Sequence, residues 1–365
     1  MPNSRDHSSP KGPFMLDYLK ERADEIDRRM ELVLPRVVTA EWVREVLGNS
    51  TYDVDIETLS ESLSTPVWDF LDRGGKRWRP VLLLTAAEAV CGDVALAEPL
   101  LPMIEFIHNG TLVHDDLEDD SELRRGRPCL HKLYGVDIAT NVGSAMYFVP
   151  MVILYGKHAP YTDVQRLQIY DLVIQELVRC HCGQALDIAW HKNPYRKIGE
   201  PEYLQMCAYK TGVLARLAAK LGAYVAGGTE AQVEELGRFG ETLGVSFQIQ
   251  DDILNLTGVE FAKGKGRGED IHEGKLTLLV LRALENSSDR DAERLREILA
   301  EHPTDQTVID EAIEIIERSG AIEYALRKAR ELMKHSWRAL DGVIDESPAK
   351  ERLREFAAFV TKREI

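Results

Sequence analysis

The residues of this sequence best suited to chemistry are the carboxylates of an acidic segment at positions 115–122. Six of its eight residues are Asp or Glu. If the segment is helical, side chains three and four positions apart lie on one face. Asp115, Asp116 and Asp119 would then converge at a spacing suited to Mg²⁺, which prefers carboxylate oxygens. Like charges this close repel one another unless a cation binds them or water surrounds them.

The residues before this segment indicate whether a cation or water surrounds the carboxylates. An acidic run alone is more often a solvated helix face than a metal site. Here the same predicted helix carries a series of apolar side chains just before the carboxylates, which are Met103, Ile104, Phe106, Ile107, Leu112 and Val113. The helix is therefore expected to be buried up to that point, and buried carboxylates need a partner.

A second oxygen cluster with similar spacing follows much later in the chain. Asp251, Asp252 and Asn255 lie within an apolar helical pattern at residues 243–256. Two buried helices are thus predicted to face each other and to bind Mg²⁺ between them. Because Mg²⁺ is usually held by one or two carboxylates together with substrate phosphates, the substrate is expected to carry phosphate.

Basic residues gather beside both acidic clusters, in a chain whose net charge is -16. Lys76, Arg77 and Arg79 follow a Gly pair just before a predicted helix, whose N-terminus favours anions. The other basic or polar candidates are Arg124, Arg125, Lys210, Thr211, Lys263, Lys265, Arg267 and Lys275. Singly, each would most often be an ordinary surface residue. Together they indicate two phosphate-bearing ligands, one bridged to carboxylates through metal and one held by cations directly.

The elements that position these residues are predicted to be helices. From residue 73 nearly to the end, helical patterns follow one another between short breaks marked by Gly or Pro, without alternating strand patterns. Residues 14–47 predict an amphipathic helix interrupted near Pro35. Residues 1–13, rich in Pro, Ser and charge, are expected to form a disordered tail. Residues 14–365 are predicted to form a single all-α domain of roughly a dozen helices.

The composition excludes several classes of protein. Hydrophobic residues make up 44% and charged residues 29%, as in folded, water-soluble proteins. The negative net charge argues against nucleic acid as a partner. The apolar stretches 81–84 and 146–155 are shorter than the ~20 residues that cross a bilayer, and no secretion signal is visible, so no transmembrane segment is expected. Five cysteines, an odd number, indicate reduced thiols in the cytoplasm.

Taken together, these segments resemble the trans-isoprenyl diphosphate synthases of the polyprenyl synthetase family, of the geranylgeranyl or polyprenyl diphosphate synthase type. DDLED at 115–119 and DDILN at 251–255 are similar to the two Asp-rich motifs of that family. The resemblance covers roughly residues 65–285. The further matching segments, in family order, are GGKRWRP at 74–80, RRGRP at 124–128, GQALD at 183–187, KTG at 210–212, FQIQDD at 247–252 and GKGRGEDIHEGKLT at 264–277.

The resemblance implies an all-α bundle around a deep central cavity, with the two Asp-rich motifs facing each other at its mouth, and a homodimer. It implies about three Mg²⁺ ions, with the ligands Asp115, Asp116, Asp119, Asp251, Asp252 and Asn255. The residues implied to hold an allylic diphosphate are Arg124, Lys210, Thr211, Gln248, Lys265 and Lys275. Those implied to hold isopentenyl diphosphate are Lys76, Arg79, His108 and Arg125.

The reaction implied by the resemblance joins isopentenyl diphosphate to dimethylallyl, geranyl or farnesyl diphosphate. Metal ions and basic side chains draw electrons into the allylic diphosphate, which leaves as the C–O bond breaks. The double bond of isopentenyl diphosphate attacks the resulting cation in a water-poor cavity. The departed diphosphate takes the proton. By analogy, the carbonyl of Lys210, the hydroxyl of Thr211 and the amide of Gln248 add negative potential beside the cation.

Asn255 departs from the family pattern, in which many members carry Asp. Its amide offers an oxygen ligand without a charge, so weaker metal binding is expected there. Two alternatives stay open: a class I terpene cyclase, which also ionises an allylic diphosphate, and a non-catalytic subunit of a heteromeric prenyl synthase. A cyclase has no second diphosphate to hold. The basic residues at 74–80 and the Arg124–Arg125 pair, which could hold one, therefore argue against a cyclase.

The helix before the first motif is expected to control product length. Gly110 and Thr111 are small at positions where short-chain members of the family often carry aromatic residues. The product is therefore expected to be C20 or longer, with C20 or C25 favoured. Ile107 is expected to line the path one turn deeper, and Tyr147 or Phe148 of a later helix to form its floor.

Overall fold

Helices account for nearly all of the regular structure of the chain. The structure is a computed structural model that describes residues 13–90, 92, 94–156, 159–258 and 267–361. Within these residues the strands are limited to one short hairpin, in which β1 (Leu123–Arg124) pairs antiparallel with β2 (Arg127–Pro128). The predicted all-α fold is confirmed.

The helices follow one another with short connections. The elements up to the hairpin are α1 (Pro13–Val33), α2 (Ala40–Val46), α3 (Ile56–Leu59), η1 (Ser60–Ser64), α4 (Thr65–Leu71), α5 (Trp78–Ala89), η2 (Val94–Leu96), η3 (Glu98–Leu100) and α6 (Leu101–Glu118). The middle elements are α7 (Leu130–Tyr134), α8 (Val136–Phe148), η4 (Val149–Met151), α9 (Val152–Tyr155), α10 (Asp163–His191), α11 (Glu200–Cys207), η5 (Ala208–Gly212) and α12 (Val213–Val225). The last are α13 (Glu230–Thr257), α14 (Glu269–His272), α15 (Leu278–Asn286), α16 (Asp289–Glu301), α17 (Gln306–Arg318), α18 (Ala321–Asp341) and α19 (Pro348–Thr361).

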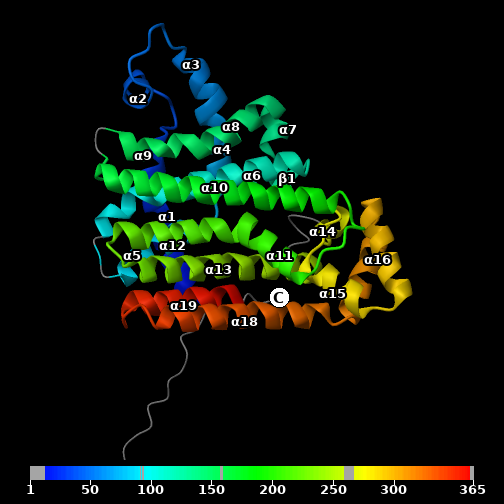
Figure 1. Cartoon of the computed structure of the whole chain (residues 1–365). Coiled ribbons are helices and arrows are strands. Elements are labelled where there is room, and N and C mark those ends of the chain that lie inside the picture. The colour runs from blue at the N-terminus through cyan, green and yellow to red at the C-terminus, as the bar shows by residue number, and fades with distance from the viewer. Residues whose placement is uncertain (1–12, 91, 93, 157–158, 259–266, 362–365) are drawn as a thin grey trace, which may run out of the picture.

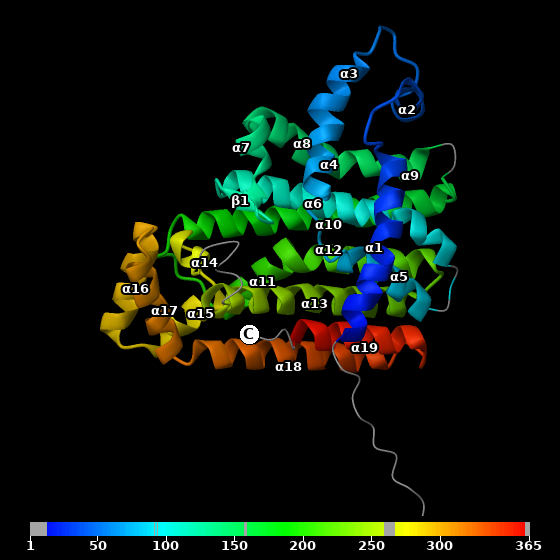
Figure 2. The same ribbon diagram turned by 180° about the vertical axis from the view of Figure 1, so that it is seen from behind.

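The long helices lie side by side in layers (Figure 1). α12 packs against α5 and α13, α13 packs against α18, and α6 packs against α8. From behind, α1 crosses the bundle and contacts α5, α6 and α19 (Figure 2). In Figure 1, α2 and α3 project above the bundle and α14 to α17 gather at its right-hand end, and Figure 2 shows the same elements from behind.

Local sequence explains where the two longest site helices begin. Thr162 precedes α10 and Thr229 precedes α13, and each Thr side chain accepts a hydrogen bond from the backbone N–H three residues later. In return, the side-chain oxygens of Gln165 and Gln232 accept hydrogen bonds from the backbone N–H groups of Thr162 and Thr229. These reciprocal caps satisfy N–H groups that a helix start otherwise leaves without partners.

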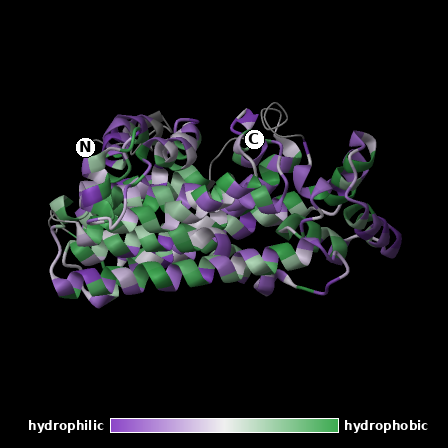
Figure 3. Ribbon diagram, turned by 90° about the horizontal axis from the view of Figure 1, so that it is seen from above, coloured by the Kyte–Doolittle hydropathy of each residue, from purple (hydrophilic) through white to green (hydrophobic). Residues whose placement is uncertain are grey.

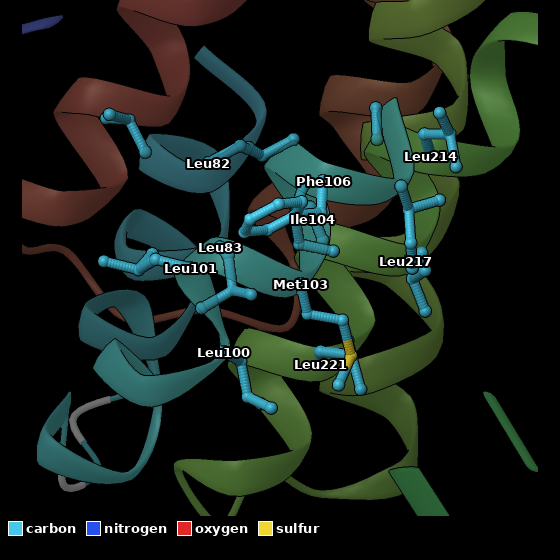
Figure 4. Packing of buried hydrophobic residues seen from close by; sticks show 14 of the residues in the cluster. Leu82, Leu83, Leu100, Leu101, Met103, Ile104, Phe106, Leu214, Leu217 and Leu221 are labelled. Carbon is cyan, nitrogen blue, oxygen red and sulfur yellow. The ribbon is translucent and has the colours of Figure 1, made fainter. Parts of the chain in front are cut away.

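The main core forms where α5, α6 and α12 meet. Figure 4 shows apolar side chains of the three helices packed together with Leu100 of η3; also labelled are Leu82, Leu83, Leu101, Met103, Ile104, Phe106, Leu214, Leu217 and Leu221. A second core joins α11, the C-terminal half of α13 and α15 to α18. Seen from above, the outer helices alternate apolar and hydrophilic residues, as expected for helices with one buried face (Figure 3).

A buried ion pair fixes the loop before α5. Arg77 is 5% exposed, adopts a left-handed backbone conformation with φ 49°, and donates to Glu105 of α6 at 2.7 Å. It also donates to Asp27 of α1 at 3.1 Å and to the carbonyl of Leu71 at 3.0 Å. Removal of either partner would leave a buried charge uncompensated. The loop that carries Lys76 is thereby held against two helices.

Two further expectations can be compared with the structure. The amphipathic helix interrupted near Pro35 is confirmed, because α1 ends at Val33 and α2 begins at Ala40. Residues 1–12 of the predicted tail lie outside the described residues.

The expectation that every apolar stretch is too short for a bilayer needs correction. By length and composition alone, the helical stretch Val136–Tyr155 is long and apolar enough to cross a membrane. The core helix of a soluble protein passes the same test, and buried residues of α8 such as Val142 and Met146 belong to the main core. The segment 146–155 contains only the last turn of α8, which continues through η4 into α9.

Candidate active site

The two acidic helices open onto one cavity. Its volume is about 640 Å³, within the range of small-molecule sites. Asp115 reaches it from α6, and Asp251, Asp252 and Asn255 reach it from α13. The predicted meeting of two acidic walls therefore holds for these four residues.

Asp115 is surrounded by donors. Lys210 Nζ lies 3.0 Å from its Oδ1, Gln184 Nε2 donates to the same oxygen at 3.1 Å, and Arg124 Nη2 lies 3.6 Å from Oδ2. Burial acts to raise the pKa of Asp115, but Lys210, Lys275 and Arg124 outweigh it and hold the pKa well below the ordinary value. This carboxylate is therefore ionised and available as an oxygen ligand.

Asp116 and Asp119 do not line the cavity with Asp115. Asp116 is buried and accepts a hydrogen bond from Arg124 Nε at 2.7 Å. Asp119 follows the last residue of α6 and lies 3.5 Å from Lys275 Nζ, and its pKa is raised to about 6, chiefly by burial. The expected convergence of three carboxylates is not met, because one is turned towards Arg124 and another follows the helix end. Within the described part of the chain, no three His, Cys, Asp or Glu residues are grouped to hold a metal by themselves.

The segment that carries Lys210 and Thr211 is the π-helical turn η5, between α11 and α12. Such turns interrupt the regular α-helical bonding and occur often at functional sites. Lys210 Nζ bridges Asp115 and Asp187, at 3.0 and 2.6 Å. Its backbone carbonyl accepts a weak bond from the Cys180 thiol at 3.7 Å. Burial acts to lower the pKa of Lys210, but the two carboxylates raise it above the ordinary value, so the ammonium is retained.

On the second wall, Asp252 accepts two hydrogen bonds. Tyr203 donates to Oδ2 at 2.6 Å and Gln248 Nε2 donates to Oδ1 at 2.8 Å. Gln248 in turn accepts the Thr211 hydroxyl at 2.9 Å. The predicted catalytic residues Lys210, Thr211 and Gln248 all line the cavity, and Thr211 and Gln248 are in direct contact.

Asn255 connects the second motif to the segment that follows it. Its side-chain Oδ1 accepts the backbone N–H of Asp270 at 3.3 Å, and its carbonyl accepts the N–H of Gly268 at 3.0 Å. Asp270 and Lys275 of that segment line the cavity. The side-chain amide of Asn255 thus supports the backbone segment that carries Lys275.

The remaining basic residues of this segment differ in their placement. Lys275 forms ion pairs with Asp119 and Glu273. Arg267 lies 3.6 Å from Asp310 and 3.8 Å from Glu317 of α17 and does not line the cavity. Lys263 and Lys265 lie outside the described residues.

A separate cationic group lines the cavity beside the first wall. Arg79 Nη1 lies 3.3 Å from His108 Nε2, and Arg125 donates to the carbonyl of Gly74. Lys76 Nζ lies 5.3 Å from the ring centroid of Phe359 in α19. Burial, reinforced by Arg79 and Arg125, holds the pKa of His108 well below its ordinary value, so the imidazole is neutral. Burial lowers the pKa of Arg79 to about 10, which leaves it charged at neutral pH.

The three residues expected to control product length separate. Thr111 lines the cavity, whereas Gly110 and Ile107 are buried in the core. A Cβ on Gly110 would lie 2.9 Å from the carbonyl oxygen of Gly143 and 3.0 Å from Met146 Cβ. Gly110 therefore serves the close approach of α6 and α8 and does not line the cavity, and its part in product length stays a prediction.

Aromatic residues line the cavity near Thr111. The Tyr147 ring stacks on His114, with centroids 5.6 Å apart, and meets His181 edge-on at 5.5 Å. All three line the cavity. Phe148, the other floor candidate, is 65% exposed and lies outside the cavity lining.

Sequence reasoning missed the roles of three cavity residues. Gln184 donates to both Asp115 and Glu118, and Asp187 pairs with Lys210. Both belong to the matched segment GQALD, which resembles the family pattern but gave no role for its individual residues. Tyr203 lies outside the matched segments, and nothing in the sequence pairs it with Asp252.

Comparison with known proteins agrees with this geometry. Residues 60–316 match the family described as polyprenyl synthetase, and the chain belongs to that family. It is 37% identical over 328 residues to a short chain isoprenyl diphosphate synthase of Methanothermobacter thermautotrophicus, covering 89% of this chain and 96% of the relative.

Two solved structures extend the likeness to the fold. Geranylgeranyl pyrophosphate synthetase from Pyrococcus horikoshii superposes with a TM-score of 0.82 at 30% identity, covering 96% of this chain and 99% of the other. A polyprenyl synthase from Caulobacter crescentus, in complex with calcium and isoprenyl diphosphate, has a TM-score of 0.79 at 25% identity, covering 98% and 99%. The predicted family is confirmed.

The different placements of Gly110 and Thr111 predict different costs for the same substitution. Gly110→Val inserts a branched side chain against the backbone of Gly143 and is expected to destabilise the fold by about 1–3 kcal/mol. Thr111→Val is nearly isosteric at the cavity surface and is expected to cost less. Urea unfolding of both variants measures the difference, and equal midpoints would contradict the packing role of Gly110.

Proposed function

We propose that the protein is a chain-elongating trans-prenyltransferase that condenses isopentenyl diphosphate with an allylic diphosphate. One observation carries the proposal: two different anion-binding groups share one cavity. The first combines carboxylates with cations, around Asp115 and Asp251. The second is formed by basic side chains and a neutral imidazole, around Arg79, His108 and Arg125. A two-substrate reaction between diphosphates requires both.

The acidic walls fit Mg²⁺ by the chemistry of their donors. The side chains facing the cavity there offer carboxylate and amide oxygens, which Mg²⁺ prefers. A diphosphate would complete the coordination, because Mg²⁺ commonly takes one or two protein carboxylates and several other oxygens. In our proposal Asp115, Asp251 and Asp252 hold the metal–diphosphate end, with Asp116, Asp119 and Asn255 as further ligands after rearrangement. When bound, Mg²⁺ supplies positive charge that stabilises the leaving diphosphate.

The basic residues of the cavity then act on the two substrates. Lys210, Lys275 and Arg124 exchange their carboxylate partners for the allylic diphosphate and stabilise it as the C–O bond breaks. Lys76, Arg79, His108 and Arg125 hold isopentenyl diphosphate beside it. Its double bond forms the new C–C bond to the allylic cation, and the departed diphosphate accepts the proton that is lost.

The Lys210 carbonyl and the Thr211–Gln248 pair face the region where the cation forms in this proposal. Carbonyl and hydroxyl oxygens there provide negative potential without acting as nucleophiles. The Thr211 hydroxyl donates to Gln248, so its oxygen lone pairs stay available. The buried thiol of Cys180 has a pKa raised to about 12 by burial and stays neutral, so it adds no competing nucleophile.

A product assay tests the function and separates its alternatives. The purified chain is incubated with Mg²⁺, isopentenyl diphosphate and dimethylallyl, geranyl or farnesyl diphosphate, and products are identified by mass. We expect elongated linear prenyl diphosphates. Cyclic hydrocarbon with released diphosphate would indicate a terpene cyclase, and activity only after addition of a partner chain would indicate a non-catalytic subunit.

We further propose that the product is C20 or longer and that Tyr147, with His114 and His181, forms the floor of its channel. Thr111 and these three rings line the same cavity as Asp115. The small side chain of Thr111 leaves the channel open past the first acidic motif. The aromatic rings then set the end of the channel.

Thr111→Phe is expected to shorten the product and to retain turnover, because the added ring blocks the channel without contacting the diphosphate residues. Thr111→Ser, which keeps the hydroxyl and removes only a methyl group, is the matched control and should give the wild-type product. Chromatography of the dephosphorylated products measures the chain lengths. An unchanged distribution for Thr111→Phe would remove this helix from the control of length.

We propose that two copies of the chain associate through α8 and α10. Residues 164, 167, 174 and 178 are spaced so that they share one face of α10, and they are exposed Val, Leu, Ile and Val. Val136 and Phe148 of α8 are exposed as well. Exposed apolar side chains of this kind favour burial against a partner, and a self-complementary pairing is the commonest arrangement.

Leu167→Glu places a charge within this apolar face and is expected to yield monomers. Leu32→Glu is the control, since Leu32 is also highly exposed but lies on α1, which crosses the opposite side of the bundle (Figures 1 and 2). Light scattering of the eluting proteins measures the mass. A wild-type protein with the mass of one chain, or a dimeric Leu167→Glu variant, would contradict the proposed interface.

We also propose that residues 14–365 act as one domain in the cytoplasm. α13 and α18 contribute to both hydrophobic cores, which ties the two ends of the bundle together. The described cysteines, which are Cys129, Cys180, Cys182 and Cys207, are free thiols, as suits a reducing compartment.

A further inference from the structure

We propose that Tyr203 is a positioning residue for the metal–diphosphate end of the cavity and acts by fixing Asp252. This inference deepens the proposed function and rests on it. Tyr203 is one of the largest fully buried side chains, 1% exposed, and belongs to α11, which carries none of the residues predicted to bind substrate. Its hydroxyl nevertheless reaches the second acidic wall.

The contact between Tyr203 and Asp252 is direct and shielded from water. The hydroxyl donates to Asp252 Oδ2 at 2.6 Å, and Asp252 is 4% exposed. Hydrogen bonds to a carboxylate are short and strong, and geometry of this kind orients the acceptor.

The other oxygen of Asp252 is also engaged, so the carboxylate is held from both sides. Gln248 Nε2 donates to Oδ1 at 2.8 Å. The Gln248 carbonyl oxygen accepts the Thr211 hydroxyl at 2.9 Å, which fixes the orientation of the amide. Tyr203 of α11, Asp252 and Gln248 of α13, and Thr211 of η5 thus form one chain of hydrogen bonds.

Loss of the Tyr203 hydroxyl would release one end of this series of hydrogen bonds. Asp252 would keep its bond to Gln248 but would be able to turn about it, because among the described residues no other hydrogen bond holds Oδ2. Outer partners that orient metal-binding carboxylates commonly change metal affinity when they are removed. The effect should fall on Mg²⁺ and diphosphate, and not on isopentenyl diphosphate, which the proposal places against Arg79, His108 and Arg125.

The test uses Tyr203→Phe, which keeps the ring and removes only the hydroxyl. Thermal unfolding of the full chain is followed as Mg²⁺ is titrated in the presence of inorganic diphosphate, a probe that needs no turnover. The Mg²⁺ concentration for half of the stabilisation is expected to rise about tenfold. In steady-state kinetics, the same variant should require more Mg²⁺ while the KM for isopentenyl diphosphate stays within about twofold.

Tyr161→Phe is the matched control. Tyr161 is also buried, and its hydroxyl donates to the carbonyl of Leu96 at 2.8 Å, in the main core and outside the cavity lining. Its removal deletes a similar buried hydroxyl without touching Asp252. The Mg²⁺ dependence of this variant is expected to equal that of the wild type, even if its melting temperature falls.

A double-mutant comparison shows whether Tyr203 acts through Asp252. Asp252→Asn should raise the Mg²⁺ requirement by itself, and adding Tyr203→Phe to it should have little further effect, because the two residues act as a unit. Wild-type Mg²⁺ dependence in Tyr203→Phe, or fully additive effects in the double variant, would overturn the positioning role alone. A wild-type chain that Mg²⁺ and diphosphate do not stabilise would overturn the proposed function, and the positioning role with it.

Discussion

The balance of buried charge is the constraint on which this structure depends. Carboxylates from two helices far apart in the sequence face one cavity, and each would be costly there without a cation. Lys210 supplies the central cation. It pairs with Asp115 and Asp187, and these carboxylates keep its ammonium group protonated. Lys275 pairs with Asp119 in the same way. A diphosphate with its metal ions would replace these internal pairs by equivalent ones, so the charges proposed to bind substrate are already held in place.

The scaffold places these charges through irregular turns set between regular helices. The π-helical turn η5 carries Lys210 into the cavity between two α-helices that are packed on both sides. The loop before α5 needs the left-handed conformation of Arg77 and its buried pair with Glu105. In both places a strained or unusual backbone is supported by well-packed neighbours, which is typical of functional sites.

The sequence predicted the fold and the two acidic walls because the signals were strong and local. Apolar residues at helical spacing beside clustered carboxylates indicated buried acidic helices, and the structure brings Asp115 and Asp251 to one cavity. The orientation of single side chains was beyond the sequence. Asp116 is neighbour to Asp115 yet turns to Arg124, and Gly110 is neighbour to Thr111 yet packs against α8. Tyr203 was missed because its partner lies in another helix, and only the packing of α11 on α13 brings them together.

We propose that the two acidic walls share metal ions through one diphosphate. The decisive measurement is a crystal structure of the protein with Mg²⁺, isopentenyl diphosphate and a non-reactive thiolo analogue of the allylic diphosphate. We expect metal ions that contact Asp115 on one side and Asp251 on the other, joined by the diphosphate of the analogue, with isopentenyl diphosphate against Arg79 and Arg125. Metal and diphosphate bound to one wall only, or both diphosphates in the same subsite, would contradict it.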